Sequence, residues 1–226
     1  MRLAGVSATR ARPEGALKLA VPRGALWDGT LALIERLGMG TDELRSDSRS
    51  LVFEGEELVL VTMRPSDVPT YVEAGAADLG ITGKDVLLEQ PERAVYELVD
   101  LGFGACTMVL AGRRGDQSLG EAERRLGAMR IATKYPRTAE RYFHDTGRQA
   151  EVIEVKGSVE LAPLVGLADG IVDLVDTGRT LVENDLEVRE EITRCTARLV
   201  ANRVAHKLRA AEVDELVARM REAAGS

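Results

Sequence analysis

Cysteine, histidine and aromatic residues are scarce in this chain of 226 residues. With two cysteines and two histidines, the sequence is too poor in these ligands for a disulfide framework or a structural metal centre. We therefore expect a reducing compartment, the cytoplasm. Aromatic side chains make up 4% of the chain and hydrophobic ones 45%, so the core must be mainly aliphatic.

Long apolar runs are also missing. No stretch approaches the roughly 20 residues that span a bilayer, so we expect no membrane association. Residues 1–16 contain arginines but no apolar segment of the kind found in secretion signals, and we expect a flexible lead-in there. The formal net charge of −7 argues against a nucleic-acid binder, which would need a basic surface.

Short apolar strands alternate with helical segments along the chain, which predicts an α/β fold with a mainly parallel sheet. The order of these segments predicts a second α/β set inserted within the first. We therefore predict two lobes, residues 17–103 with 187–226 and residues 104–186, with a cleft between them. Residues 104–111 and 192–202 are predicted to be long strands that carry the chain out and back.

The last segment predicts a closing helix. Its apolar residues recur at the helical spacing i, i+3, i+4, i+7, at Val213, Leu216, Val217 and Met220. We expect this face to pack on the helix's own lobe rather than on a partner.

Residues 160–181 have the composition of a phosphate-binding segment. We predict a helix over 160–168, a strand over 171–175, and a turn over 176–180 that leads into a helix near Leu181. In the turn, Gly178 allows close backbone approach to an anion, Thr177 and Thr180 offer hydroxyls, and Arg179 adds positive charge. Asp173 and Asp176 suit sugar hydroxyls, so the segment favours a phosphorylated sugar. An ordinary helix cap at Thr177, eased by Gly178, explains the turn alone equally well.

The wider pattern resembles the signature of ATP phosphoribosyltransferases. Its spaced positions are Glu160, Gly166, Ala168, Ile171, Asp173, Leu174, Thr177, Gly178, Thr180 and Leu181. Residues 61–69, 77–85 and 130–136 are similar to the short form of this family, and the likeness extends over nearly the whole chain from Leu17.

This resemblance implies two α/β lobes like those of type II periplasmic binding proteins. It also implies transfer of the 5-phosphoribosyl group of phosphoribosyl pyrophosphate (PRPP) to N1 of ATP, with release of pyrophosphate and with Mg²⁺ bound through the substrate. Short-form enzymes assemble with a regulatory subunit similar to histidyl-tRNA synthetase. The resemblance therefore implies a hetero-octamer that contains dimers of the catalytic chain.

The reaction is a direct displacement at the anomeric carbon. N1 of adenine already has a free lone pair, so orientation and charge stabilisation can supply the catalysis without a covalent nucleophile. Candidate site residues are given roles because they match the family and lie at predicted strand ends. For each arginine, the alternative is that it is a solvated surface charge with no role in binding. The leaving pyrophosphate is assigned to Arg23 and Arg49, and ATP to Arg64, Asp78, Lys134 and Tyr135. PRPP is assigned to Asp173, Asp176, Thr177, Gly178, Arg179 and Thr180.

One departure affects the leaving-group site. Ala25 stands where family members often have an arginine, so a contact of that arginine with the leaving group is missing here.

Two other functions stay open on the sequence: a solute-binding module with the same two lobes, and a different sugar-phosphate enzyme that uses the same phosphate cradle.

Overall fold

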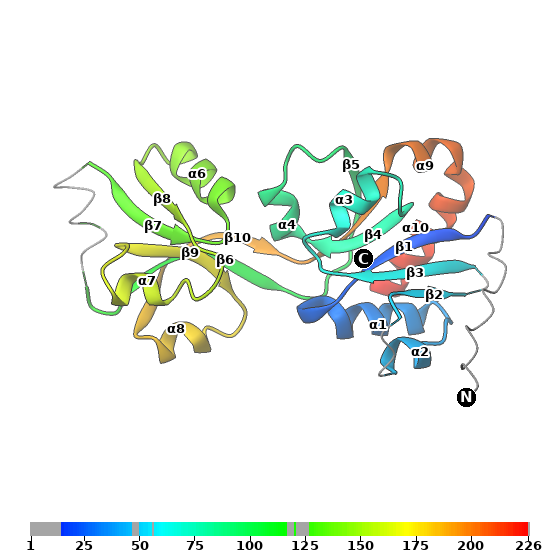
Figure 1. Cartoon of the computed structure of the whole chain (residues 1–226), viewed down its shortest axis with the longest axis horizontal. Coiled ribbons are helices and arrows are strands. Elements are labelled where there is room, and N and C mark those ends of the chain that lie inside the picture. The colour runs from blue at the N-terminus through cyan, green and yellow to red at the C-terminus, as the bar shows by residue number, and fades with distance from the viewer. Residues whose placement is uncertain (1–14, 47–49, 56, 117–119, 121–126, 226) are drawn as a thin grey trace, which may run out of the picture.

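The computed structural model describes residues 15–46, 50–55, 57–116, 120 and 127–225. Their strands form two sheets that lie side by side along the long axis of the molecule (Figure 1). The predicted lead-in falls mostly on residues 1–14, outside the described residues.

The first sheet has the order β2-β3-β1-β4-β11-β5. Its strands are β1 (Leu17–Pro22), β2 (Val52–Glu54), β3 (Leu58–Met63), β4 (Leu79–Gly83), β5 (Val95–Asp100) and β11 (Ala197–Asn202). Its helical elements are η1 (Gly24–Leu26), α1 (Trp27–Arg36), α2 (Asp42–Arg45), α3 (Val68–Glu73), α4 (Lys84–Glu89), α9 (Arg203–Leu208) and α10 (Ala210–Ala224).

Both faces of the first sheet are covered. Alternate residues of β1 point to opposite faces, so Leu19 joins a core with α1 and α10, whereas Ala20 joins a core with α3. The four apolar residues of the predicted closing helix are all buried in the α1–α10 core. This confirms that α10 packs on its own sheet.

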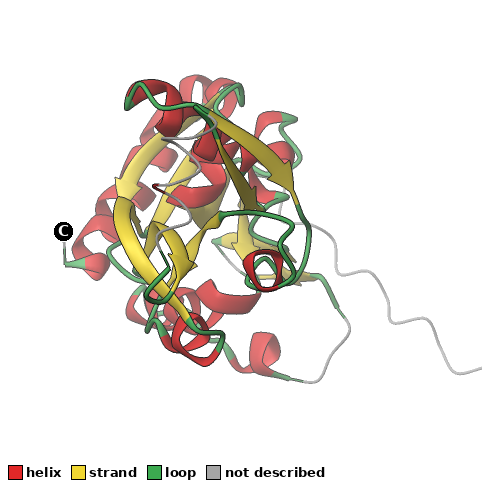
Figure 2. Cartoon of the chain, turned by 90° about the vertical axis from the view of Figure 1, so that its left-hand side faces the viewer, coloured by secondary structure: helices red, strands yellow, loops and turns green. Residues whose placement is uncertain are grey.

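The second sheet has the order β10-β6-β9-β7-β8. Its elements are β6 (Cys106–Arg113), β7 (Met129–Thr133), α6 (Pro136–Asp145), β8 (Ala150–Glu154), α7 (Leu161–Leu164), β9 (Gly170–Val175), α8 (Arg179–Glu183) and β10 (Leu186–Cys195). Val172 faces a core with α6, and Ile171 faces a core that includes Ala162 and Leu181 of α7 and α8. Figure 2 shows helices on both sides of the strands.

The sheets are mixed, so the prediction of a mainly parallel sheet was wrong. β1 is parallel to β3 and β4, and β7 is parallel to β8 and β9. The other ladders are antiparallel. In four of them a strand next to a crossing runs against its neighbour: β6 against β9 and β10, and β11 against β4 and β5. The fifth joins the consecutive strands β2 and β3.

Two predicted elements were also wrong in extent. The single strand expected over 192–202 is two strands in different sheets, divided at Thr196, whose carbonyl accepts a hydrogen bond from the backbone of Lys84. The helix expected over 160–168 is the short α7 alone. It contains Pro163, which has no backbone donor, and it is followed by Gly166 with a left-handed φ of 74°.

The chain passes between the sheets twice, through residues 101–105 and through Thr196. We call the region around these two crossings the junction; β6 and β10 run into it in Figure 1. The predicted lobe boundaries stay a prediction, but β10 pairs with β6 of the second sheet from Leu186 to Cys195. In the described parts of the chain, no helix is both long and apolar enough to cross a membrane.

Candidate functional site

Two of the predicted arginines lie at the same edge of the first sheet. Arg23 follows β1 and Arg64 follows β3, and these parallel strands end in register at Pro22 and Met63. The backbone N–H of Arg23 donates to the carbonyl of Met63 at 2.8 Å. Both side chains are exposed, and Lys84 follows the neighbouring parallel strand β4. Lys84 is paired with Glu97 at 2.7 Å, so among the described residues the unpaired positive charge at this carboxyl edge comes from the two exposed arginines.

The corresponding edge of the second sheet carries the other predicted group. Lys134 and Tyr135 follow β7, and Asp176 begins the turn after its parallel neighbour β9. Lys134 Nζ lies 3.4 Å from Oδ1 of Asp173. Burial raises the pKa of the Asp173 carboxyl, and the charge of Lys134 opposes that rise.

Both carboxyl edges border the junction. In the first sheet, the backbone N–H of Lys84 donates to the carbonyl of Thr196, in the second crossing, at 3.0 Å. In the second sheet, Val175 at the end of β9 pairs with Thr107, two residues after the first crossing. The structure thus brings Arg23, Arg64, Lys134 and the 173–180 segment to edges that meet at one region of the molecule.

The structure confirms a turn after β9, but the turn covers residues 176–178 and the last two residues of the predicted 176–180 segment belong to α8. Gly178 has φ 75° and ψ −2°, and α8 begins directly after it, at Arg179 rather than near Leu181. Asp176, Thr177, Arg179 and Thr180 are exposed. Arg179 Nε donates to Glu183 at 2.8 Å. Because both of these side chains are solvated, the pair holds Arg179 only weakly and leaves it able to turn toward a ligand.

Tyr135 is fixed at the end of β7 and packs against the core of the second sheet that faces α6. Its backbone N–H donates to the hydroxyl of Thr133 at 2.9 Å, and that hydroxyl donates to the carbonyl of Val172 at 2.6 Å. Burial raises the pKa of the Tyr135 phenol, and the carboxylates of Asp85 and Asp173 raise it further. The ring therefore stays neutral, as a stacking surface requires.

Asp78 is placed away from this group, at the opposite edge of the first sheet. It precedes β4, and its Oδ2 accepts a hydrogen bond from the backbone of Lys18, near the start of β1, at 2.8 Å. Arg209 lies 3.7 Å from the same carboxylate, and the carbonyl of Asp78 accepts from Asn202 at 2.9 Å. These contacts hold together the edge of the sheet at which the parallel strands β1 and β4 begin. Arg49, the remaining predicted residue, lies outside the described residues.

The sequence analysis missed Asp85 at the junction. Burial raises the pKa of its carboxyl, and hydrogen bonds from backbone N–H groups, including that of Val86, oppose the rise. Its carboxylate folds over Gly83: a Cβ added there would lie 2.0 Å from Oδ1. The available signal was a charged pair, Lys84-Asp85, directly after the residues that form β4.

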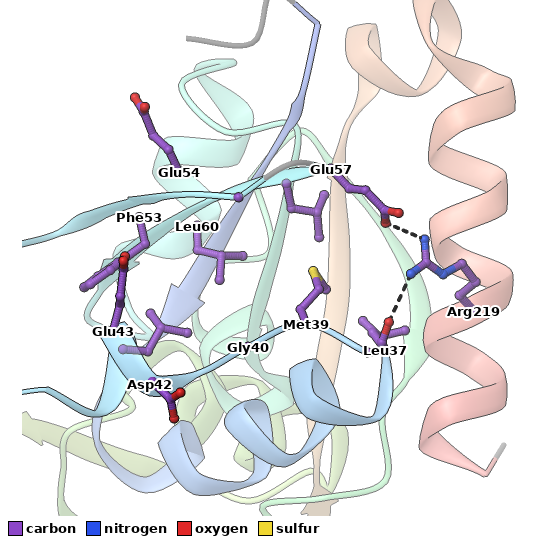
Figure 3. A pocket seen from close by; sticks show the side chains of 14 residues that line it. Leu37, Met39, Gly40, Asp42, Glu43, Phe53, Glu54, Glu57, Leu60 and Arg219 are labelled. Carbon is purple, nitrogen blue, oxygen red and sulfur yellow. Dashed lines mark hydrogen bonds and ion pairs between the residues drawn. The ribbon is translucent and has the colours of Figure 1, made fainter. Parts of the chain in front are cut away.

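A cavity of about 580 Å³ lies elsewhere, between the end of α1, β2 and the start of β3 (Figure 3). Its lining includes Asp42, Glu43, Glu54 and Glu57, and Arg219 at its rim is bonded to Glu57 at 2.8 Å. None of the predicted site residues that the structure describes lines it. Its acidic lining disfavours polyphosphates, so we do not assign the substrates to it.

Metal binding by the chain alone has little support. Over the described ranges, no three or more His, Cys, Asp or Glu side chains are grouped so that they could hold a metal ion.

Comparison with known proteins gives one consistent result. A family model described as ATP phosphoribosyltransferase (HisG) matches residues 64–222. A protein from Rubrobacter xylanophilus, named ATP phosphoribosyltransferase, is 55% identical over 205 residues, which are 89% of this chain and 94% of that protein.

Solved structures agree with these relatives. The ATP phosphoribosyl transferase (HisG:HisZ) complex from Thermotoga maritima contains a chain that is 37% identical, with a TM-score of 0.77 and coverage of 92% of this chain and 98% of that one. The periplasmic aliphatic sulphonate binding protein SsuA from Escherichia coli is 13% identical, with a TM-score of 0.60 and coverage of 92% and 72%. The latter likeness shows the fold alone, and it confirms the predicted periplasmic-binding-protein architecture.

Proposed function

This chain belongs to the ATP phosphoribosyltransferase family, and we propose how its residues divide the work of that reaction. The enzyme transfers the 5-phosphoribosyl group of PRPP to N1 of ATP and releases pyrophosphate, the first step of histidine biosynthesis. One observation carries the proposed division: the cationic strand ends of one sheet and the 176–180 turn of the other border the same junction.

The 5-phosphate of PRPP is assigned to the turn formed by Thr177, Gly178, Arg179 and Thr180. The left-handed Gly178 leaves its backbone approachable, and the exposed hydroxyls and guanidinium on either side are donors to phosphate oxygens. Ribose hydroxyls are assigned to Asp176, which is exposed, and to Asp173, which also positions the ammonium of Lys134.

The pyrophosphate end is assigned to Arg23, with Arg49 as a further candidate, and Arg64 at the same strand edge is assigned to the polyphosphate of ATP. Positive charge close to the departing oxygens stabilises the transition state more than the ground state, because charge builds up there as the bond breaks. Ala25 contributes no charge at this edge. Lys134 and Tyr135 border the ATP site, and the neutral ring of Tyr135 offers a surface on which adenine can stack. Asp78 has a structural role in this proposal.

Mg²⁺ is proposed to enter as part of the substrate complex. Mg²⁺ prefers oxygen ligands and commonly binds through one or two carboxylates together with substrate phosphates. The exposed carboxylate of Asp176 fits that pattern, and the described residues offer no larger set of ligands. When bound, the ion neutralises charge on the leaving pyrophosphate.

For the assembly, we propose two lobes that meet at the junction. Residues 17–103 with the segment from Thr196 onward form one lobe, and residues 104–195 form the other.

We further propose a cytoplasmic enzyme that binds a HisZ-like regulatory subunit. The Thermotoga maritima complex of HisG with HisZ supports this partner.

The assay that tests the function combines the purified chain with ATP, PRPP and Mg²⁺, with and without a co-expressed HisZ-like subunit. We expect pyrophosphate release together with a change in adenine absorbance. A solute-binding module would bind ligands without releasing pyrophosphate, and another sugar-phosphate enzyme would consume PRPP without changing the adenine spectrum. Absence of both signals in the presence of the partner would overturn the assignment.

A further inference from the structure

The chain's two cysteines face each other across neighbouring strands. Cys106 is the first residue of β6, Cys195 is the last residue of β10, and the two are directly opposed in the antiparallel ladder. Directly opposed residues in such a ladder have Cα atoms about 4.5–5.5 Å apart, and their side chains lie on the same face of the sheet. Disulfides span Cα separations of about 4.4–6.8 Å, so the backbone already has suitable geometry.

The two thiols differ in pKa and in exposure, and this difference suits them to react one after the other during oxidation. Cys195 donates a hydrogen bond to the sulfur of Cys106, which lowers the pKa of the Cys106 thiol, while burial and the charges of Asp85 and Asp176 oppose that effect. The same bond, with burial, raises the pKa of Cys195. Cys106 is half-buried, whereas Cys195 is 1% exposed. The accessible thiol is thus the more nucleophilic one, and the buried thiol lies behind it.

The pair lies at the junction. Residues 101–105 lead directly into Cys106, and Thr196, which follows Cys195, leads into β11 of the first sheet. A covalent bond between these two cysteines would tie the two crossings together.

We propose that Cys106 and Cys195 form a reversible, peroxide-oxidisable dithiol whose disulfide restrains the junction between the two sheets. The strand register places the two cysteines opposite each other whatever reaction the chain catalyses.

The chemistry balances with hydrogen peroxide as the oxidant. The Cys106 thiolate attacks one peroxide oxygen, the O–O bond breaks, and the departing hydroxide takes up a proton to become water. Cys106 is then a sulfenic acid. The Cys195 sulfur attacks the Cys106 sulfur, the S–O bond breaks, and hydroxide leaves with the Cys195 proton as a second water. Two thiols and one peroxide yield one disulfide and two waters.

The test uses the full-length chain, reduced and then treated with hydrogen peroxide. We expect both free thiols to disappear, the intact mass to fall by two hydrogens, and a cross-linked peptide pair containing Cys106 and Cys195 to appear in a non-reducing digest. Dithiothreitol should reverse all three changes. In the oxidised protein, amide hydrogen exchange at residues 101–106 and 195–197 should slow by about tenfold or more, since local opening there is restrained.

Two variants separate the roles of the cysteines. Cys195→Ser should still react with peroxide but stop at a sulfenic acid on Cys106, which dimedone traps, whereas Cys106→Ser should lose most of its peroxide reactivity. Cross-linking between chains instead of within one chain would overturn the proposal. So would unchanged hydrogen exchange at the crossings of the fully oxidised wild-type protein, a result that depends on no variant.

Discussion

The carboxylate of Glu89 is hydrogen-bonded to Thr138. Glu89 ends α4 on the first sheet, and Thr138 lies in the first turn of α6 on the second sheet. The carboxylate accepts hydrogen bonds from the backbone N–H of Thr138 at 3.0 Å and from its hydroxyl at 2.8 Å. The backbone N–H of Arg137 donates to the other carboxylate oxygen at 3.0 Å. One acidic side chain therefore caps a helix of the other sheet, so the two sheets are joined by more than the two crossings.

Removing this contact should loosen the two sheets. The carboxylate satisfies N–H groups that the helix cannot satisfy itself, and it is favoured by the positive end of the helix dipole. We expect Glu89→Ala to lower the free energy of unfolding by about 0.5–2 kcal/mol, as loss of a helix cap does. Small-angle scattering should show a larger radius of gyration for the variant without ligands.

Glu140→Ala is the matched control for Glu89, because Glu140 is exposed on α6 itself. It should leave both stability and radius of gyration close to the wild-type values. If the control and Glu89→Ala behave alike, the contact across the junction has no role in holding the sheets.

Trp27 should report ligand binding at the carboxyl edge of the first sheet. It is the chain's one tryptophan, and the guanidinium of Arg23 lies 4.8 Å from its ring centre. A pyrophosphate that draws Arg23 away changes the environment of the ring. We expect Mg-pyrophosphate to alter Trp27 fluorescence in the wild type and not in Arg23→Met, and the variant's affinity should fall about tenfold or more.

Arg36→Met serves as the control for this measurement, since Arg36 is an exposed arginine at the far end of α1. It should retain both the fluorescence change and the affinity. A full fluorescence response in Arg23→Met would show that pyrophosphate does not contact this arginine.

The turn after β9 should affect PRPP far more than ATP. Thr180→Ala removes one hydroxyl donor, and Gly178→Val forces a branched residue into φ 75° at a cost of about 1–2 kcal/mol or more. We expect each change to raise the KM for PRPP about tenfold and to leave the KM for ATP nearly unchanged. Thr70→Ala, an exposed threonine of α3, should alter neither constant. Equal effects on both substrates would contradict the assignment of the 5-phosphate to this turn.

Asp85 should destabilise the protein at neutral pH. Burial raises the pKa of its carboxyl in the folded state, so the folded protein holds this proton more tightly than the unfolded chain does. The resulting stability is present at low pH and is lost as pH rises from the unfolded value of about 3.9 through the raised folded value. Asp85→Asn should therefore melt at a higher temperature than wild type at pH 7.

The pH dependence of that gain is the sharper test. The difference between Asp85→Asn and wild type should shrink as pH falls and vanish near about pH 3, where both forms are neutral. Asp28→Asn, at an exposed position on α1, should show no gain at pH 7. A gain for Asp85→Asn that does not change with pH would show that the charge is not its cause.

The sequence was most informative where local pattern decides structure. The spacing of Val213, Leu216, Val217 and Met220 predicted the buried face of α10. A turn at Gly178 was likewise expected, because its neighbours are typical of a turn that opens a helix.

Strand order and strand direction were less accessible, since both depend on contacts far apart in sequence. Nothing local in residues 192–202 shows that the chain changes sheets at Thr196. Asp78 and Lys84 flank the same short strand, and only its direction in the sheet decides which of them reaches the junction. The facing of Cys106 and Cys195 follows from the register of β6 and β10, which their spacing in the sequence does not reveal.

The position of β11 has a consequence for synthesis on the ribosome. β5 pairs only with β11 among the described strands, and β11 lies between β4 and β5 although it is the last strand of the chain to be translated. During translation the first sheet therefore stays incomplete beside β4, because β11 cannot pair there until translation has passed residue 202. The second sheet, whose strands are all made by residue 195, can close earlier, so the half that begins first finishes last.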